Sequence, residues 1–242
     1  MVRIGYMPHN YQTFAADFLK RQQISAIFLD CGLGKTIITL SAVNDLLFDS
    51  FQAHRVLIVA PLRVACVTWP AEIQKWDHLS LLTDSVAVGT GMERKAAFMK
   101  QADIYIINRE NVQWLVEQSG LPFDYDMIVV DELSSFKSCQ AKRFRSLMKV
   151  RPTVKRVVGL TGTPSANGLM DLWAEFRLLD LGKRLGRFIT HYRDEFFLPD
   201  KRNGQQIFTY KPKPGAEDEI YRRISDITIS MKSTDYLHMP DC

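Results

Sequence analysis

The stretch that decides the fold of this chain is Ser25-Ala26-Ile27-Phe28-Leu29-Asp30-Cys31-Gly32-Leu33-Gly34-Lys35-Thr36. It begins as an apolar run typical of a buried strand, and residues 37–43 after it have a helical composition. Strand, glycine-rich loop and helix is the order that a phosphate-binding loop needs. Gly32 and Gly34 allow the backbone N–H groups of the loop, that of Leu33 included, to turn toward phosphate oxygens at the positive end of the helix. The stretch therefore predicts a nucleotide-phosphate site.

Two side chains supply the chemistry of this loop. We expect Lys35 to reach the β- and γ-phosphates and Thr36 to bind Mg²⁺ through its hydroxyl group. The strict pattern of such loops has glycine where this chain has Leu29, so the match is incomplete. The alternative is an ordinary glycine-rich turn with a lysine in solvent, but the helix that follows favours a nucleotide site.

Five further apolar, β-branched runs alternate with stretches of helical period, and they are 55–60, 85–88, 103–107, 127–130 and 156–160. Strands without polar alternation are buried on both faces, so helices must cover both faces of their sheet. We therefore expect an α/β sandwich with a mainly parallel central sheet flanked by helices. Ligands of such sheets bind beyond the carboxyl ends of the strands, which selects the loops after Leu29, Ala60, Val130 and Leu160.

An acidic pair follows one of these strands. Asp131 and Glu132 come directly after the run 127–130. Hydrolysis of ATP needs a carboxylate that handles Mg²⁺ and a group that deprotonates the attacking water. We expect Asp131 to hold the metal through water and Glu132 to be the base. A pair that merely caps a strand is the alternative, and the phosphate loop upstream argues against it.

The composition excludes several classes of protein. With 46% hydrophobic and 24% charged residues, the chain resembles an ordinary soluble globular protein with a sizeable core. No apolar run approaches the roughly 18 residues of a membrane span, and the start lacks a secretory signal, so we expect a cytoplasmic protein. The 4 cysteines form no C-x-x-C pair, which argues against a disulfide framework or a zinc site. A net charge of +4 is too small to identify a nucleic-acid binder.

The sequence pattern changes near Asp180. Residues 182–214 are rich in Arg, Lys, aromatic, Gly and Pro residues and lack sustained buried-strand signals, while residues 216–224 have the period of a short helix. We expect a nucleotide-binding domain over residues 1–181. Residues 182–242 are expected to form a basic, irregular extension with one helix.

Four blocks carry a resemblance to a known family, and they are Gly32-Leu33-Gly34-Lys35-Thr36, Ala60-Pro61-Leu62, Asp131-Glu132-Leu133-Ser134 and Leu160-Thr161-Gly162-Thr163-Pro164. In this order they resemble the Swi/Snf branch of the superfamily-two DEAD/DEAH-box helicases, especially the compact versions of bacteriophages. The resemblance covers nearly the whole chain. It implies the RecA-like ATP-binding lobe of a motor on double-stranded DNA, located in the bacterial host cytoplasm if the chain is phage-encoded.

The resemblance also implies roles for residues outside the phosphate site. Gln12 matches a glutamine that reads adenine, since a side-chain amide both donates and accepts on the edge of that base, and Tyr11 lies beside it. A surface or capping glutamine is the alternative. Thr161 and Thr163 match a segment that couples the ATP site to the DNA surface, and an ordinary turn formed by Gly162 and a proline is the alternative.

Candidate DNA contacts lie in the loops after two other strands. By resemblance, Arg63 and Thr68 belong to a first DNA-contact segment over residues 61–76, and Asn108 and Arg109 form a second loop. Such side chains bind phosphates without reading sequence, although a solvated surface is an equal alternative for each. Trp69 and Trp76, which lie 7 residues apart in the same segment, are expected to pack in the core rather than stack on bases.

The chain departs from the family pattern in two respects. Many relatives have Asp-Glu-Ala-His where this chain has Asp-Glu-Leu-Ser, so Ser134 cannot make the contacts of an imidazole. Motors of this family also use a second RecA-like lobe, which we expect as a partner, since its arginine contributes on the order of 10³ to 10⁵ in rate. On its own the chain is expected to hydrolyse ATP feebly.

Three hypotheses of function follow. The first is the ATP-binding and ATP-hydrolysing lobe of a helicase-like translocase on double-stranded DNA, with ATP and Mg²⁺ as cofactors and a nuclease or replication protein as a candidate partner. The alternative is a nucleotide-gated DNA-binding or recruitment module with no appreciable catalysis of its own. A small-molecule phosphotransferase is disfavoured, because it leaves the block at residues 160–164 unexplained.

Overall fold

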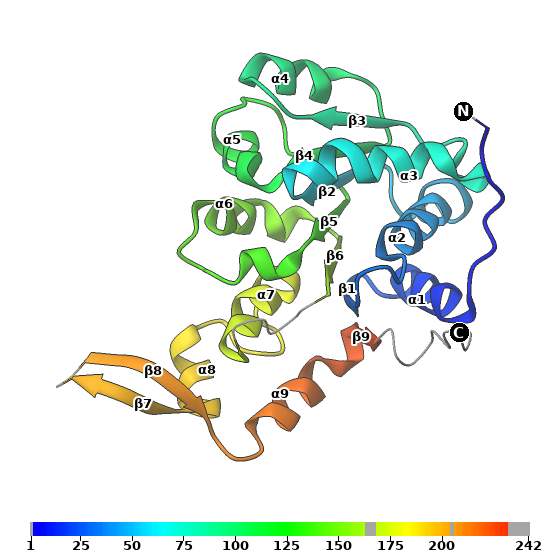
Figure 1. The fold of residues 1–242 in the computed structure, drawn as a ribbon. Helices are drawn as coiled ribbons and strands as arrows, with labels where there is room; N and C mark the ends of the chain where they lie inside the picture. Colours follow the sequence, from blue (N-terminus) through cyan, green and yellow to red (C-terminus); the bar gives the residue numbers. More distant parts are fainter. Residues whose placement is uncertain (1, 163–167, 204–205, 232–242) are drawn as a thin grey trace.

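The computed structural model describes residues 2–162, 168–203 and 206–231 of the chain (Figure 1). At its centre lies a 7-stranded sheet in the order β3-β4-β2-β5-β6-β1-β9, and every neighbouring pair is parallel. The strands of this sheet are β1 (Ile24–Leu29), β2 (Val56–Ala60), β3 (Asp84–Ala87), β4 (Ile104–Asn108), β5 (Met127–Asp131), β6 (Arg156–Thr161) and β9 (Thr228–Met231). The prediction of an α/β sandwich with a mainly parallel sheet is confirmed, and each of the strands expected from the sequence is present.

Successive residues of the central strands point into two different cores. In β1, Ala26 and Phe28 belong to one hydrophobic cluster, whereas Ile27 and Leu29 belong to the other. All four side chains are at most 3% exposed. Because both faces of the sheet are covered, these strands need no polar residues, which is why they are continuously apolar in sequence.

Helices form a layer on each face of the sheet (Figure 1). The helices of one layer are α1 (Asn10–Arg21), α2 (Lys35–Asn44) and α3 (Trp69–Lys75). The opposite layer includes α4 (Gly91–Met99), α5 (Val112–Glu117), α6 (Lys142–Val150) and α7 (Met170–Asp180). None of the helices in the described ranges is long and apolar enough to cross a membrane.

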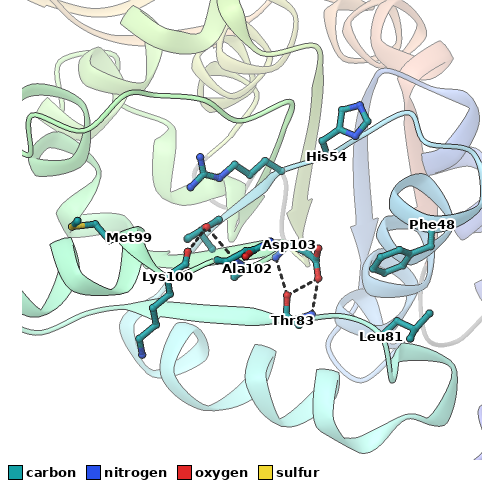
Figure 2. A pocket seen from close by; sticks show the side chains of 11 residues that line it. Phe48, His54, Leu81, Thr83, Met99, Lys100, Ala102 and Asp103 are labelled. Carbon is teal, nitrogen blue, oxygen red and sulfur yellow. Dashed lines mark hydrogen bonds between the residues drawn. The ribbon is translucent and has the colours of Figure 1, made fainter.

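A hollow of about 700 Å³ lies at the amino ends of β2, β3 and β4 (Figure 2). Its wall includes His54 just before β2, Thr83 just before β3 and Asp103 just before β4. The carboxylate of Asp103 accepts hydrogen bonds from the backbone N–H and the hydroxyl of Thr83, at 2.9 and 2.6 Å. Parallel sheets bind their ligands at the carboxyl ends of the strands, so this hollow at the amino ends is not the expected ligand site.

The part of the chain after residue 181 is more regular than the sequence suggests. It contains α8 (Ile189–Phe196), an antiparallel hairpin of β7 (Phe197–Asn203) and β8 (Gln206–Pro212) that projects from the body, α9 (Ala216–Ile224) and β9 (Figure 1). The expected helix matches α9, but the expectation of an irregular extension is wrong. The sequence pattern does not predict β9, because an edge strand of 4 residues with alternating burial has little apolar signal. The boundary at residue 181 stays a prediction, although β9 joins the sheet of the first part beside β1.

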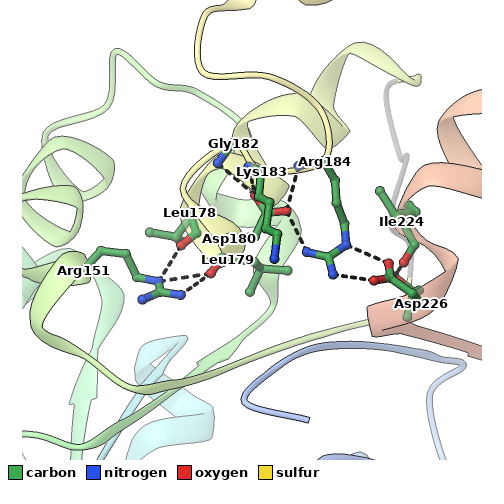
Figure 3. A network of polar contacts seen from close by, with 10 residues as sticks. Arg151, Leu178, Leu179, Asp180, Gly182, Lys183, Arg184, Ile224 and Asp226 are labelled. Carbon is green, nitrogen blue, oxygen red and sulfur yellow. Dashed lines mark hydrogen bonds and ion pairs between the residues drawn. The ribbon is translucent and has the colours of Figure 1, made fainter.

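A polar network holds this second part against the first (Figure 3). Asp180, at the end of α7, accepts the backbone N–H groups of the next turn and pairs with Arg184 at 3.1 Å. Arg184 also donates from Nε and Nη2 to the carboxylate of Asp226, between α9 and β9, at 2.7 and 2.5 Å. The buried Arg151 donates to the carbonyls of Leu178 and Leu179 in the last turn of α7. Arg184 therefore connects the end of α7 to the segment before β9, and Arg151 holds the last turn of α7 from the other side.

Candidate nucleotide site

The glycine-rich loop joins β1 to α2 at the carboxyl edge of the sheet. Gly32 and Gly34 have φ angles of 89° and 80°, in the left-handed region that favours glycine. A Cβ atom on Gly34 would lie 2.6 Å from Nε2 of Gln12, so the loop passes directly against that amide. Leu33, between the glycines, is fully buried and anchors the loop in the core. Because α2 begins at Lys35, the unpaired N–H groups of its first turn lie at the same point.

Lys35 folds back onto the start of this loop. Its Nζ atom donates to the backbone carbonyls of Leu29 and Asp30, at 2.6 and 3.2 Å. A cleft of about 450 Å³ opens beside it, within the size range of small-molecule sites. The polar and aromatic side chains that line this cleft are Gln12, Lys35, Thr36, Thr68, Glu72, Lys75 and Trp76. The cleft thus combines the phosphate loop with Gln12 on one side and α3 on the other.

Glu132 is held by two hydroxyl groups. It has a φ angle of 59°, which turns the chain sharply after β5. Its Oε1 atom accepts hydrogen bonds from Ser134 Oγ at 2.6 Å and from Thr161 Oγ1, at the end of β6, at 3.2 Å. A carboxylate with two donors on one oxygen is oriented and keeps its other oxygen for a further contact. The structure therefore places Thr161 directly on the candidate base, whereas Thr163 lies outside the described residues.

Asp131, the last residue of β5, has a different partner. Its Oδ2 atom accepts a 2.9 Å hydrogen bond from the indole N–H of Trp69. Burial raises the pKa of Asp131 above its ordinary value, the Trp69 hydrogen bond opposes this, and the neighbouring Glu132 charge adds to it. The Lys35 ammonium group also lowers the pKa of Asp131, so the loop lysine favours the charged form of this carboxyl group.

Gly162, directly after β6, packs against the phosphate loop. A Cβ atom on Gly162 would lie 3.4 Å from the carbonyl oxygen of Leu29 and 3.8 Å from Nζ of Lys35. The segments after β1, β5 and β6 therefore meet at one edge of the sheet, as the order of motifs in the sequence requires.

Gln12 is fixed at its oxygen end. Its Oε1 atom accepts from the backbone N–H of His9 at 3.0 Å and from the Tyr6 hydroxyl at 3.4 Å. This leaves the amide nitrogen on the side of Gly34 and the cleft. Gln12 therefore closes the start of α1 as a capping residue and also borders the nucleotide cleft, so the two alternatives drawn from the sequence are not exclusive. Tyr11 donates to the carbonyl oxygen of Leu33 at 3.3 Å and ties α1 to the loop.

The donor groups suit Mg²⁺ shared with a nucleotide better than a metal held by protein alone. Within the described ranges, no group of 3 or more His, Cys, Asp and Glu side chains gathers in a way that could hold a metal. Mg²⁺ ordinarily keeps several waters and binds through one or two protein oxygens and the phosphates of a substrate. Thr36 and Asp131, at the phosphate loop and beside it, provide oxygens of that kind.

The candidate DNA contacts differ in their surroundings. Arg63 and Thr68 are exposed, on the π-helical segment Val64–Thr68 or next to it. Asn108 is only 5% exposed; it donates to Glu110 at 2.9 Å and accepts from Asn111 at 2.5 Å. Arg109 is paired with Glu110 at 2.9 Å. The first segment is thus open to a ligand, while Asn108 organises the loop in which it lies.

Sequence reasoning overlooked the polar role of two residues and a buried acid. Trp69 lies in the core, as expected, but it also contacts Asp131, and Ser134 orients Glu132 rather than merely replacing a histidine. Glu175, on α7, is fully buried and neither carboxylate oxygen has a hydrogen-bond partner in the described part of the chain. Burial, then the charges of Asp171 and Glu132, raise the pKa of Glu175 well above its ordinary value. No sequence spacing indicates the contact between Trp69 and Asp131, because it joins α3 to the end of β5, 62 residues further along the chain.

Comparison with known proteins identifies the family of the chain. The family model described as SNF2-related domain matches residues 11–207. A phage protein, "Putative protein p41" of Acyrthosiphon pisum secondary endosymbiont phage 1, is 34% identical over 242 residues, which cover 98% of this chain and 53% of that protein. "DNA excision repair protein ERCC-6-like" of Danio rerio is 30% identical over 176 residues, covering 68% of this chain and 12% of the relative.

Solved structures show the same fold. The Sulfolobus solfataricus SWI2/SNF2 ATPase core in complex with dsDNA matches with a TM-score of 0.75 at 21% identity, over 94% of this chain and 45% of that chain. The chain therefore spans about half the length of the phage relative and less than half of the archaeal core.

Proposed function

The chain belongs to the SNF2-related family, and on that premise we propose that it is the ATP-binding and ATP-hydrolysing lobe of a translocase that acts on double-stranded DNA. The observation that carries the proposal is the meeting of the phosphate loop, the acidic pair and the end of β6, with Thr161 and Gly162, at one edge of the sheet. In this arrangement the groups proposed to bind the triphosphate and to activate water come together from the ends of β1, β5 and β6.

We assign binding of the triphosphate to the loop and to Lys35. The backbone N–H groups from Gly32 to Thr36 would bind phosphate oxygens, and the ammonium group of Lys35 would exchange its two backbone carbonyl contacts for the β- and γ-phosphates. The amide of Gln12 would hydrogen-bond the adenine edge, which gives a preference for ATP. Mg²⁺, when bound, would neutralise phosphate charge beside Thr36 and Asp131.

Glu132 is proposed as the base for the attacking water. Its Oε1 atom accepts from Ser134 and Thr161, and within the described ranges no residue donates to Oε2, so Oε2 is the atom that would accept the proton of the water. The water then attacks the γ-phosphorus, the bond to the β-phosphate oxygen breaks, and ADP and inorganic phosphate leave. Thr161 would connect this step to the loops that face DNA.

The DNA side of the proposal rests on the exposed segment after β2. Arg63 and Thr68 would bind backbone phosphates without reading bases, in keeping with a motor that tracks along a duplex. The archaeal structural relative is described in complex with dsDNA. Because the chain spans about half of the phage relative, we propose that a second lobe supplies an arginine worth on the order of 10³ to 10⁵ in rate.

The test is ATP hydrolysis by the purified chain with and without duplex DNA. Lys35→Ala and Glu132→Gln are the site variants, and Lys149→Ala and Glu217→Gln are matched controls on exposed helical positions far along the chain. We expect slow hydrolysis that duplex DNA stimulates, that both site variants abolish and that neither control changes.

Other outcomes would redirect the proposal. Binding of ATP without turnover, with tighter DNA binding in its presence, would support the nucleotide-gated recruitment module instead. Hydrolysis that survives Glu132→Gln would refute the assigned base. Failure of the wild-type chain to bind ATP at all would refute the nucleotide site.

A further inference from the structure

Trp69 connects two parts of the molecule that the sequence leaves separate. Its side chain is 0% exposed, and its indole N–H donates to Oδ2 of Asp131 at 2.9 Å. Asp131 stands at the carboxyl end of β5, where it is the candidate metal carboxylate. Partners that hydrogen-bond a metal-binding carboxylate from behind orient it and tune its affinity for the ion. Trp69 occupies such a place.

The segment that carries Trp69 also carries the exposed candidate DNA contacts. α3 begins at Trp69, directly after the π-helical segment Val64–Thr68, and Arg63 directly precedes that segment. One helical turn further on, Glu72 lines the nucleotide cleft, as Thr68 does. Residues 3 and 4 apart share a helix face, so Thr68 and Glu72 face the cleft while Trp69 and Ile73 face the core. A single short element therefore adjoins the surface, the cleft and Asp131.

The backbone just before Trp69 is unusual. Val64–Thr68 forms a π-helical turn, and the backbone N–H of Trp69 donates to the carbonyl of Val64, five residues back. A π turn holds one residue more than an α turn. Isolated π turns are rare and are frequently found at functional sites. A change to an α-helical turn would move this N–H to the carbonyl of Ala65 and rotate Arg63 relative to Trp69. An α-helical turn is the alternative arrangement nearest to the one observed.

We propose that Trp69 is a positioning residue, which orients Asp131 through its indole N–H and transmits to it the engagement of duplex DNA by Arg63 and Thr68. The metal and the duplex in this inference rest on the proposed function, but the contact between Trp69 and Asp131 does not. Hydrolysis can depend on DNA only if binding of DNA alters the metal site, so a DNA-dependent motor needs a contact that joins the two.

The decisive variant is Trp69→Phe, which keeps an aromatic ring but removes the indole N–H together with the volume of the five-membered ring. Trp173→Phe is the matched control, since the buried Trp173 donates its indole N–H to the carbonyl of Gly186 at 3.1 Å, away from Asp131. The first readout is the Mg²⁺ concentration needed for binding of a fluorescent ADP derivative, with and without duplex DNA. We expect Trp69→Phe to weaken the apparent Mg²⁺ affinity by about tenfold, the lower end of effects from such supporting contacts.

In the same titrations, binding of the derivative in EDTA should be unchanged by Trp69→Phe. Duplex DNA should shift the Mg²⁺ dependence of the wild type and of Trp173→Phe but not that of Trp69→Phe. Equal Mg²⁺ dependence in the wild type and Trp69→Phe, or an equal response of both to duplex DNA, would overturn the inference.

A second readout needs no nucleotide. The chain has 4 tryptophans, so ¹⁵N spectra of the indole groups contain few resonances, and Trp69→Phe identifies that of Trp69. We expect this resonance to move on Asp131→Ala and again when duplex DNA is added to the wild type. If the wild type binds no nucleotide, the proposed function fails while this spectrum still decides the inference. A Trp69 resonance that shifts neither on Asp131→Ala nor on addition of duplex DNA would overturn the inference.

Discussion

Gly34→Ala is a substitution whose consequences follow closely from the geometry of the loop. Gly34 has a φ angle of 80°, where a residue with a Cβ atom loses about 1–2 kcal/mol. The new Cβ would also lie 2.6 Å from Nε2 of Gln12 and 3.2 Å from Cγ2 of Ile37. Because the Gln12 amide is the end of a flexible side chain, it should move aside and leave the position proposed for adenine recognition. Gly32→Ala is the matched control: its φ angle is 89°, but no other atom lies within 4 Å of the added Cβ.

Two measurements separate backbone strain from the loss of Gln12. Thermal unfolding should show a similar destabilisation for both variants, about 2–4 °C in Tm for each kcal/mol. Competition binding of ATP and GTP should show that only Gly34→Ala loses selectivity, by about tenfold, the equivalent of one hydrogen bond of roughly 1.4 kcal/mol. Wild-type selectivity in Gly34→Ala, or an equal loss in Gly32→Ala, would refute the role assigned to Gln12.

Three further substitutions test other contacts. Ser134→Ala removes the 2.6 Å hydrogen bond to Glu132 and should lower kcat about tenfold at unchanged KM. Ser134→Thr, which keeps a hydroxyl group, should restore kcat, and an unchanged kcat in Ser134→Ala would contradict the role of Ser134 in orienting Glu132. Glu175→Met removes a buried acid whose pKa is raised well above 4.5 by burial. The folded wild type therefore holds a proton that the unfolded chain releases, and it loses stability as the pH rises above 4.5. Urea unfolding should show the variant gaining stability relative to the wild type as the pH rises, and a parallel pH dependence would argue against a buried neutral acid. Arg184→Ala leaves the fully buried Asp180 carboxylate without its ion pair and should reduce the free energy of unfolding by about 1–3 kcal/mol. The control Arg222→Ala, whose Glu219 partner is more exposed, should reduce it less. Equal effects of the two variants would mean that the network in Figure 3 does not hold the C-terminal part in place.

Much of the fold can be predicted because the buried strands leave a direct trace in the sequence. Ile27 and Phe28 face different cores, so a strand covered on both sides must be apolar at every position. The weak points are elements with little burial. β9 has 4 residues at a sheet edge, and the β7–β8 hairpin pairs outside the main sheet, so neither has a strong apolar pattern.

The site shows the same division between local and distant information. The phosphate loop is local, because Gly32, Gly34 and Lys35 must adjoin one another for the loop to turn and bind phosphate. The contacts from Trp69 to Asp131 and from Thr161 to Glu132 join residues 62 and 29 positions apart, and they exist only because parallel strands end at one edge. Sequence patterns identify such groups singly, and the fold decides which of them meet.

The measurement that tests the central claim most directly is binding of Mg²⁺·ATP to the wild-type chain and to Lys35→Ala by calorimetry, with Lys149→Ala as the control. We predict one site per chain in the wild type and in the control, and a loss of affinity of at least about tenfold in Lys35→Ala, because a charge-assisted contact to phosphate contributes roughly 1.5–3 kcal/mol. Equal binding by the wild type and Lys35→Ala would contradict the account.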